Sequence, residues 1–346
     1  MVPSLAVAGE LRRRGNSALF IGTRRGMEAR LAPAAGFPIE WIETGALNRV
    51  TLARKLRTFW QMPASIVRSW LILRRTSVAG VFSMGGYVAA PVLVAAVLRG
   101  VPIVAMEPNA MPGIVSRRMA RFVYRSLVAF EAARAWFPPG RSELCGLPVR
   151  EAFFQIEERP ADAPLTVLLT GGSQGSRALN RAACDAWPRL KAALPELRWI
   201  HQSGSQELEA LRGAFAESGL AGEVTAFVED MASAYAAVDL VVGRSGAGAV
   251  AELAAAGRAA LLVPFPFAAD DHQRHNAQAL VAGGAARMLE ESELNGESLC
   301  AAVCELAQDR QRLIEMGRNA RKLARPGAAK RAVDVLEAAA AASRMR

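Results

Sequence analysis

The chain has 346 residues, 52 % of them hydrophobic and 21 % charged, which excludes a disordered chain and allows two domains of ordinary size. The amphipathic, arginine-rich amino terminus does not have the pattern of a signal peptide. The four cysteines, Cys145, Cys184, Cys300 and Cys304, form no Cys-x-x-Cys pair, so we expect free thiols and no metal site.

Positive charge is concentrated in the first part of the chain. Residues 1–150 contain 21 Lys and Arg against 7 Asp and Glu, a net charge of +14, whereas the remainder contains 21 against 25, a net charge of −4. A basic domain can meet nucleic acid, anionic lipid or a phosphorylated substrate. Because no RNP-like or helix-turn-helix signature accompanies the basic residues, we expect no nucleic-acid partner.

The first helix is expected to begin near Pro3 and to end at Gly15, and a strand is expected directly after it. In a βαβ unit a strand also precedes such a helix. The residues alone leave open whether such a strand was never there or has been lost ahead of Met1.

Strand and helix patterns alternate through nearly the whole chain, which predicts an α/β fold with parallel, doubly wound sheets. The strands are expected at 17–23, 39–44, 80–84, 102–107 and 126–130, and then at 165–170, 197–202, 223–228, 239–243 and 259–265. A looser stretch between the two series predicts a hinge. The expected domains are 1–150 and 151–325, followed by a terminal helix at 326–346.

An uncharged segment at 76–98 is long enough to imitate a membrane span. The Gly85-Gly86 pair and Pro91 divide it, so we expect a buried strand, a tight turn and the start of a helix.

The helix expected at 52–75 mixes cations with large apolar and aromatic side chains. This pattern suits a helix that rests on a membrane surface with its cations toward lipid headgroups. It also suits a helix that packs on the core with a solvated basic side.

Two glycine-rich turns follow expected strands of the second domain. In the first, Gly171, Gly172 and Gly175 allow a sharp turn and a close backbone approach to a ligand, and the following helix N-terminus favours an anion. The turn lacks the P-loop and dinucleotide-fold spacings, and many such turns are glycine-rich only for packing.

The second turn, Arg244-Ser245-Gly246, leads into a helix that carries Glu252. This carboxylate can accept hydrogen bonds from a ribose diol or simply complement the helix dipole. The proline-broken loop and helix at 263–280 add many hydrogen-bonding side chains, which indicates contact with a sugar or a base.

Several motifs together resemble the MurG family, the membrane-associated N-acetylglucosaminyltransferases of peptidoglycan precursor synthesis. They include MGGYVAAP, MEPNAMPG, GLPVR, GGSQGSRALN, HQSG, GRSGAGAVAELAAAG and DDHQRHNAQAL. They occur in the family's order and cover essentially the whole chain. The resemblance implies a GT-B fold, in which two Rossmann-like domains face each other across a cleft and the terminal helix returns to the first domain.

The family resemblance also implies the reaction. N-acetylglucosamine would pass from UDP-N-acetylglucosamine, with inversion, to the muramoyl sugar of an undecaprenyl-diphosphate-linked N-acetylmuramoyl pentapeptide, without a metal or other cofactor. The protein would be peripheral, at the cytoplasmic face of the inner membrane, where it would contact an anionic membrane surface. It would serve cell-wall synthesis, cell shape and division.

By motif position, the first glycine turn with Ser173 would hold the diphosphate near Arg150, Val228 would present backbone to the uracil, Glu252 would hold the ribose and Gln273 the sugar. The residues implied for the donor as a group are Asn109, Arg150, Gly172, Ser173, Gln174, Gly175, Val228, Ser245, Gly246, Ala247, Glu252, Gln273 and Asn276.

The implied catalytic base is harder to place in this chain. The family's first strand and its histidine-bearing loop, GGTGGH, would fall ahead of Met1, which implies a start assigned at an internal methionine or, alternatively, a natural truncation. Met106 and Pro108 replace the family's His and Gln. Glu107 therefore remains the candidate base. The residues implied for the acceptor and membrane are Arg54, Lys55, Arg57, Phe59, Trp60, Gly85, Gly86 and Tyr87.

Two alternatives remain open at the level of sequence. One is another GT-B enzyme, such as a UDP-N-acetylglucosamine 2-epimerase. The other is a catalytically impaired nucleotide- or lipid-binding remnant, because the histidine-bearing loop is missing. The chain of 346 residues is therefore expected to bind UDP and yet to transfer sugar poorly.

Overall fold

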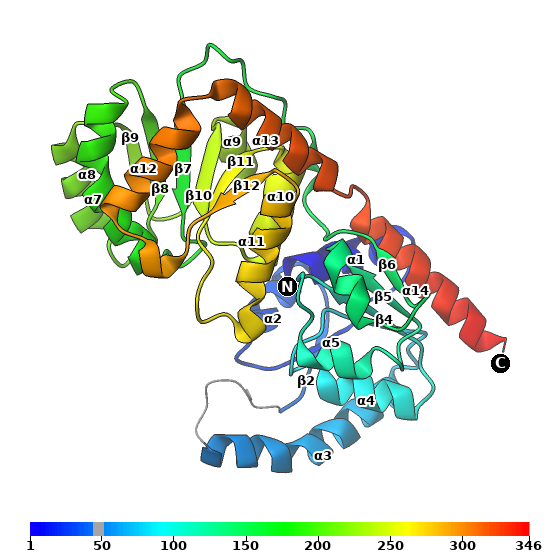
Figure 1. Cartoon of the computed structure of the whole chain (residues 1–346). Helices are drawn as coiled ribbons and strands as arrows, with labels where there is room; N and C mark the ends of the chain where they lie inside the picture. Colours follow the sequence, from blue (N-terminus) through cyan, green and yellow to red (C-terminus); the bar gives the residue numbers. More distant parts are fainter. Residues whose placement is uncertain (44–51, 346) are drawn as a thin grey trace. The chain divides into compact units, whose positions relative to one another are not determined.

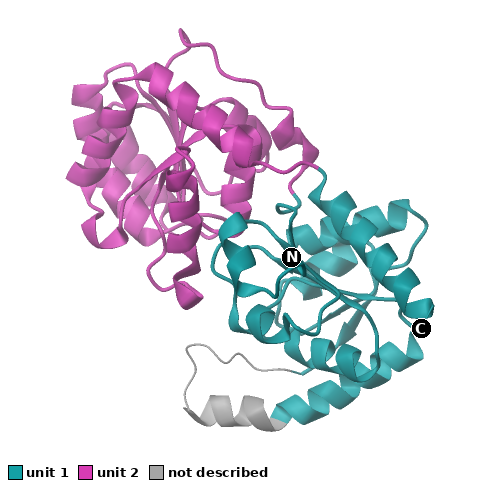
Figure 2. Ribbon diagram, turned by 45° about the vertical axis from the view of Figure 1, so that its right-hand side comes forward, with its two compact units in different colours: residues 1–148, 327–346 teal, residues 149–326 magenta. Residues whose placement is uncertain are grey.

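The computed structural model describes the backbone of residues 1–43 and 52–345, and the side chains of residues 1–43 and 61–345. Two compact units make up the chain (Figures 1 and 2): residues 1–148 with 327–346, and residues 149–326.

In the first unit, the described strands form two parallel sheets, of order β1-β2 and β3-β4-β5-β6. Both sheets contribute to one hydrophobic cluster, in which Ile42 and Ile21 join residues of β3 and α4. The elements are α1 Val2–Arg13, β1 Phe20–Gly22, α2 Glu28–Ala34, β2 Ile39–Trp41, α3 Leu52–Arg75, β3 Val81–Ser83, α4 Ala90–Leu98, β4 Ile103–Glu107, α5 Ile114–Met119, β5 Arg125–Val128, a 3₁₀ turn Glu131–Trp136, β6 Ser142–Leu144 and α14 Ala328–Arg344.

In the second unit, the described strands form one parallel sheet of order β12-β11-β10-β7-β8-β9, with helices between successive strands. Its elements are α6 Glu151–Phe154, β7 Thr166–Thr170, α7 Arg177–Ala193, β8 Arg198–Gln202, α8 Leu208–Ser218, β9 Ala221–Thr225, α9 Met231–Ala236, β10 Leu240–Gly243, α10 Ala247–Ala256, β11 Ala259–Leu262, 3₁₀ turns Ala269–Asp271 and Glu291–Glu293, α11 His272–Ala282, β12 Ala286–Met288, α12 Gly296–Ala307 and α13 Arg310–Leu323.

The predicted parallel α/β organisation is confirmed, since every strand expected from the sequence overlaps an observed one. Two short strands, β6 and β12, were not expected, because three residues at a sheet edge carry too little pattern to distinguish them from a loop. The strand expected at 223–228 is β9, which begins and ends earlier. The apolar segment at 76–98 is β3, a turn with positive φ at Gly85 and Gly86, and α4, as predicted. Among the described residues, every helix is too short or too polar to cross a membrane.

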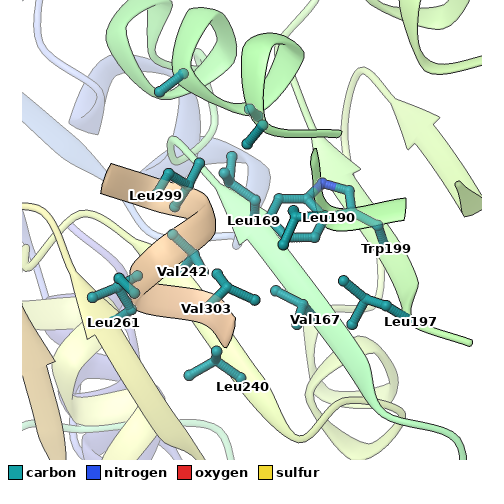
Figure 3. Packing of buried hydrophobic residues seen from close by; sticks show 14 of the residues in the cluster. Val167, Leu169, Leu190, Leu197, Trp199, Leu240, Val242, Leu261, Leu299 and Val303 are labelled. Carbon is teal, nitrogen blue, oxygen red and sulfur yellow. The ribbon is translucent and has the colours of Figure 1, made fainter. Parts of the chain in front are cut away.

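The core of the second unit explains why its strands are continuous apolar runs. All five residues of β7 are buried, because helices cover both faces of a parallel sheet. Aliphatic side chains of the central strands pack against α7 and α12 (Figure 3). At about 1.5–3 kcal/mol for each fully buried large side chain, this cluster fixes the sheet that carries the glycine turns.

The terminal helix α14 belongs to the first unit. Arg14, just after α1, forms ion pairs with Asp334 and Glu337 at 2.7 and 2.9 Å. Arg331 donates to both carboxylate oxygens of Glu143 on β6. Buried alanine, valine and leucine side chains line the inner face of α14, so apolar packing and these pairs together attach the helix.

The first glycine turn of the second unit packs tightly on the end of β8. Gly175 has φ +75°, and a Cβ on it would lie 1.9 Å from the carbonyl oxygen of Ser203. Gly172 has a similar φ of +83°, but a Cβ on it would meet no other atom within 4 Å. At Gly175, both the backbone conformation and the close packing therefore require glycine, whereas at Gly172 only the backbone conformation does.

These two glycines make a matched pair of substitutions. We expect Gly175→Ala to lower the free energy of unfolding by about 2–5 kcal/mol, because strain in φ adds to a clash with backbone that cannot move. Gly172→Ala, which meets only the strain in φ, is expected to cost about 1–2 kcal/mol. Urea denaturation of both variants measures the difference. Equal losses would contradict the close packing of this turn.

Candidate active site

The two glycine turns of the second unit lie at the carboxyl ends of neighbouring strands. Residues 171–176 follow β7 and open α7, and residues 244–246 follow β10 and open α10. β7 pairs with β10, and the chain continues from β7 to β8 on one side and from β10 to β11 on the other. Such a switch point is where doubly wound sheets bind ligands, and two helix N-termini there favour an anion.

The residues of these turns present different groups to solvent. Ser173 and Gln174 are exposed at the tip of the first turn. Gly246 is the N-cap of α10 and Ala247 is its first residue, both half-buried. The tips therefore offer backbone N–H groups, one hydroxyl and one carboxamide, a set of donors suited to phosphate oxygens.

Arg244 connects the two turns. Its Nη2 donates to the Ser176 hydroxyl at 2.7 Å and forms an ion pair with Glu291. Its Nη1 donates to the carbonyl oxygens of Val263 and Pro264 at 3.2 and 3.3 Å. The role of Arg244 was not predicted, because these hydrogen-bond partners are 19–68 residues away in the chain. An arginine directly after a buried strand was the one available signal.

Gln202, at the end of β8, is a second residue whose role the sequence did not reveal. It is 1 % exposed, its Nε2 donates to the Gly172 carbonyl at 2.8 Å, and its Oε1 accepts from the Val228 N–H at 2.9 Å. Gln202 thus fixes the first glycine turn and the segment after β9 in one arrangement. The Val228 N–H is engaged in this way, whereas no described residue donates a hydrogen bond to the Val228 carbonyl oxygen.

Ser245 and Asn276 stabilise the second turn through hydrogen bonds on its buried side. Both are fully buried; the Ser245 hydroxyl donates to the Gln273 carbonyl at 2.8 Å, and Asn276 Nδ2 donates to the Ser245 carbonyl at 3.1 Å. Gln273 Oε1 accepts from the Phe265 N–H at 3.1 Å. These contacts hold α11 against the turn and orient Gln273.

Glu252 lies in the second turn of α10 and is partly buried. Burial raises the pKa of its carboxyl group, and the nearby Arg150 guanidinium partly offsets this rise. Arg150 is exposed directly before α6, with its guanidinium 5.0 Å from the Phe153 ring centroid. The tertiary structure thus brings the charges of a carboxylate and a guanidinium group near each other, although the two residues are about a hundred positions apart in the chain.

The loop after β11 is strained. Asp270 and Asp271 have φ values of 51° and 50°, in the left-handed region that non-glycine residues avoid. Each such residue costs on the order of 1–3 kcal/mol and persists where the surrounding structure over-determines it, as at ligand sites. The strain lies at the same sheet edge as the glycine turns, since β11 is the neighbour of β10.

In the first unit, Glu107 ends β4 and is only 4 % exposed. Its Oε1 accepts from the backbone N–H of Asn109 at 3.1 Å and from Asn109 Nδ2 at 3.3 Å, and its Oε2 accepts from the Gly113 N–H at 3.3 Å. Burial raises the pKa of Glu107, while these donors and the Ser116 hydroxyl act in the opposite direction. The carboxylate therefore holds the loop at 108–113 against α5.

The turn after β3 lies beside this loop. A Cβ on Gly85 would lie 2.8 Å from the Ser116 hydroxyl oxygen, so the residues 85–87 and 107–116 meet at one edge of the sheet. Tyr87 is half-buried there. The structure thus joins two motifs, MGGYVAAP and MEPNAMPG, that the sequence placed about twenty residues apart.

On α3, the side chains of Arg54, Lys55, Arg57, Phe59 and Trp60 lie outside the described residues. Further along the helix, Val67 and Leu71 lie one turn apart and are 58 % and 52 % exposed. Arg68 between them is also exposed. The described part of α3 therefore presents an apolar pair beside a cation.

The cysteines are free thiols. Over the part of the chain that the structure describes, no group of three or more His, Cys, Asp or Glu side chains is arranged to hold a metal ion.

Comparisons with known proteins agree with this geometry. The models of the glycosyltransferase family 28 N-terminal and C-terminal domains match residues 1–128 and 166–332. A UDP-N-acetylglucosamine–N-acetylmuramyl-(pentapeptide) pyrophosphoryl-undecaprenol N-acetylglucosamine transferase of Solibacter usitatus is 50 % identical over 97 % of this chain and 92 % of the relative. The protein of the same name from Halorhodospira halophila is 44 % identical over 97 % of this chain and 94 % of the relative.

Solved structures give the same result. The crystal structure of Acinetobacter baumannii MurG is 33 % identical, with a TM-score of 0.83, and covers 97 % of this chain and 95 % of that one. A Neisseria meningitidis UDP-GlcNAc 2-epimerase has a TM-score of 0.66 at 11 % identity, which shows a shared fold alone. The two parallel-sheet units and these likenesses confirm the GT-B fold. The chain belongs to glycosyltransferase family 28.

Proposed function

We propose that this protein transfers N-acetylglucosamine from UDP-N-acetylglucosamine to the muramoyl sugar of an undecaprenyl-diphosphate-linked N-acetylmuramoyl pentapeptide. The observation that carries the proposal is the pair of glycine turns that Arg244 joins at the switch point of the second unit. The reaction is the one named for the relatives, which are up to 50 % identical over nearly the whole chain.

The second unit binds the donor. The N–H groups of the turn at 171–175 and the Ser173 hydroxyl take the diphosphate, with Arg150 as an exposed cation beside it. Glu252 accepts from the ribose hydroxyls, the Val228 carbonyl meets the uracil and Gln273 meets the sugar. Gly246 and Ala247 add the N-terminus of α10, whereas buried Ser245 and Asn276 act by shaping the turn.

Transfer is a single displacement with inversion at the anomeric carbon. The sugar hydroxyl of the acceptor attacks as a base removes its proton, and UDP leaves with growing negative charge on its diphosphate. Preorganised N–H donors and helix N-termini stabilise that charge without rearrangement, which is their main catalytic contribution. Glu107 is the candidate base in the first unit, and Asn109 is placed by Glu107 to reach the sugar.

The first unit binds the lipid-linked acceptor at the inner membrane. Its excess of cations attracts anionic lipid, and the exposed apolar side chains of α3 insert among the acyl chains. From their place in the sequence, we assign Arg54, Lys55, Arg57, Phe59 and Trp60 to contact with the acceptor or the membrane as well. The turn at Gly85, Gly86 and Tyr87 faces the acceptor. We infer a peripheral enzyme at the cytoplasmic face of that membrane.

Removal of the charge on Glu252 tests the donor site. We expect Glu252→Gln to weaken UDP binding about 10- to 100-fold, because a hydrogen bond to a charged acceptor contributes about 1.5–3 kcal/mol. Isothermal titration calorimetry with UDP measures this, and Glu223→Gln on the exposed face of β9 is the control. Unchanged affinity for the Glu252 variant would remove this residue from the site.

The role of Glu107 as base predicts both a rate and a pH effect. Glu107→Gln should lower transfer by about 10²–10⁴-fold at unchanged UDP affinity, since the residue belongs to the other unit. A base must be deprotonated, and burial raises the pKa of Glu107. Wild-type kcat/KM should therefore fall as the pH drops through a value above the usual glutamate range.

This fall in kcat/KM at low pH, the acidic limb of the pH–rate profile, should be absent in the Glu107→Gln variant. The variant of an exposed residue, Glu131→Gln, should keep it. A variant that is slow but keeps the limb would show that Glu107 positions the loop and that another group is the base.

The membrane surface is tested by vesicle sedimentation. We expect Val67→Asp with Leu71→Asp to weaken binding to vesicles of anionic phospholipid at least tenfold, because two apolar contacts of about 1.5 kcal/mol or more each are lost and negative charge is added. Val281→Asp, at a 40 % exposed position in the second unit, should bind like the wild type. Equal loss in both variants would exclude α3 as the membrane contact.

A further inference from the structure

A cavity of about 230 Å³ lies at the end of the second unit's sheet that is opposite to the glycine turns. Its lining includes residues directly before β10 and β11, the segment at 158–159 and one face of α13. Because parallel strands all run in the same direction, the amino ends of β10 and β11 cannot share an edge with the turns that follow their carboxyl ends. The cavity is therefore separate from the proposed donor site.

Five arginines line this cavity, which we call the arginine pocket: Arg159, Arg258, Arg310, Arg318 and Arg321. The acidic residues in the lining are Glu158 and Asp239, so the lining has a net charge of +3. Guanidinium groups remain charged at any ordinary pH. A pocket with this excess charge repels itself unless counter-charge is nearby.

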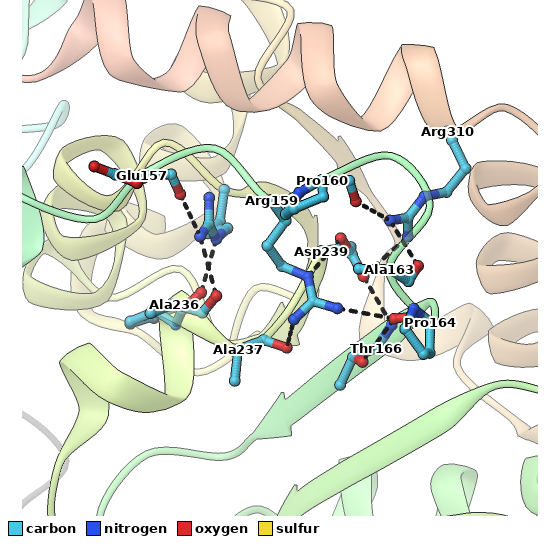
Figure 4. Close-up of polar contacts among 12 residues, drawn as sticks. Glu157, Arg159, Pro160, Ala163, Pro164, Thr166, Ala236, Ala237, Asp239 and Arg310 are labelled. Atoms are coloured by element: carbon cyan, nitrogen blue, oxygen red, sulfur yellow. Dashed lines mark hydrogen bonds and ion pairs between the residues drawn. The ribbon is translucent and has the colours of Figure 1, made fainter.

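Asp239 is shared between two of these cations. Its Oδ1 lies 3.0 Å from Arg159 Nε, and its Oδ2 lies 2.9 Å from Arg310 Nη1 (Figure 4). Glu158 pairs with Arg318, at 2.8 Å from Nε. Both carboxylates are therefore already engaged by other arginines than Arg258 and Arg321.

Among the described residues, the hydrogen-bond partners of Arg258 and Arg321 are all uncharged. Arg258 donates to the carbonyl oxygens of Tyr235, Glu157 and Ala236. Arg321 donates to those of Phe154, Ile156 and Ala256. Carbonyl oxygens satisfy donors, but they do not neutralise charge.

The consequence is visible at Arg258, which is only 4 % exposed. Burial lowers the pKa of its guanidinium to about 10. The nearby charge of Asp239 opposes this shift, the like charges of Arg159 and Arg321 add to it, and the charge of Glu158 opposes it. A buried cation that lacks a carboxylate partner is costly unless an anion reaches it.

Several N–H groups of the arginines that line the pocket are not used in hydrogen bonds within the described residues. Within the described part of the chain, Arg258 Nη1, Arg318 Nη1 and Arg310 Nε make no hydrogen bond. Planar guanidinium groups match the oxygens of a phosphate group and bind it more strongly than neutral donors do. Half of the Arg318 side chain is exposed, which leaves the pocket open to solvent.

We propose that the arginine pocket binds a multiply charged phosphate group, as inorganic phosphate or diphosphate or as a phosphate monoester, at a site distinct from the donor site. The segment at 154–164 supplies several of the carbonyl oxygens that these arginines hold. An anion in the pocket relieves the repulsion among the arginines and so stabilises the attachment of this segment to the sheet.

The test is calorimetry on the full chain with saturating UDP present, so that the glycine turns are occupied. Inorganic diphosphate and glycerol 3-phosphate, a soluble analogue of a lipid headgroup, are titrated separately. Wild-type protein should bind at least one of them, and the tighter ligand distinguishes a free phosphate from a headgroup. Absence of binding by both would overturn the proposal.

Two substitutions with opposite expected signs localise the binding. Arg318→Glu should weaken binding of the tighter ligand at least tenfold, since it reverses one charge in the lining. Glu158→Gln should tighten it several-fold, because it removes a competing carboxylate from Arg318. Arg212→Glu on α8 is the matched control, since its side chain is similarly exposed and pairs with Glu209.

If Arg318→Glu fails to fold by circular dichroism, Glu158→Gln decides alone. Affinity for the tighter ligand that is unchanged in Glu158→Gln, or reduced as much by Arg212→Glu as by Arg318→Glu, would refute the site. These results do not depend on the proposed transfer reaction, because no acceptor is present and the substitutions lie far from the glycine turns in the sheet.

Discussion

The hydrogen bond from Arg244 to Ser176 is the contact on which the second unit's site depends. Each glycine turn ends a different strand, and β7 and β10 are neighbours only because the sheet is built outward in both directions from its centre. The arginine then reaches both turns and the carbonyl oxygens after β11. Without that link, each turn would be held only by its own buried hydrogen bonds, and the two sets of donors would be less well preorganised relative to each other.

Buried polar groups complete this arrangement. Gln202 uses both ends of its carboxamide, Ser245 uses its hydroxyl and its carbonyl, and Asn276 donates to the latter. Inside a core each such group must find a partner, so the network has one satisfactory arrangement and fixes the loops that carry it. The strained φ values at Asp270 and Asp271 are tolerated beside this fixed framework. Rigid support and local strain thus occur together at one edge of the sheet.

The first unit is organised by one carboxylate instead of an arginine. Glu107 accepts hydrogen bonds from N–H groups of the loop that follows it. The turn at Gly85 lies against Ser116, so the segments after β3 and β4 are in contact. The same donors that shape the loop oppose the effect of burial on the pKa of Glu107. Glu107 therefore holds the loop from a buried position in which burial and hydrogen bonding act on its pKa in opposite directions.

The sequence by itself determined the fold class, the alternation of strands and helices, the division of 76–98 into strand, turn and helix, and the glycine turns, because hydrophobic periodicity and glycine are local signals. It also placed Glu107, Ser173 and Glu252 in motifs, although their roles as site residues remain proposals. Only the tertiary structure showed what Gln202 and Arg244 bind, that Ser245 and Asn276 are buried, and that five arginines gather in one pocket. The reason is physical: hydrogen bonds and burial join residues tens of positions apart, and no local pattern records which of many distant partners the folded sheet brings within reach.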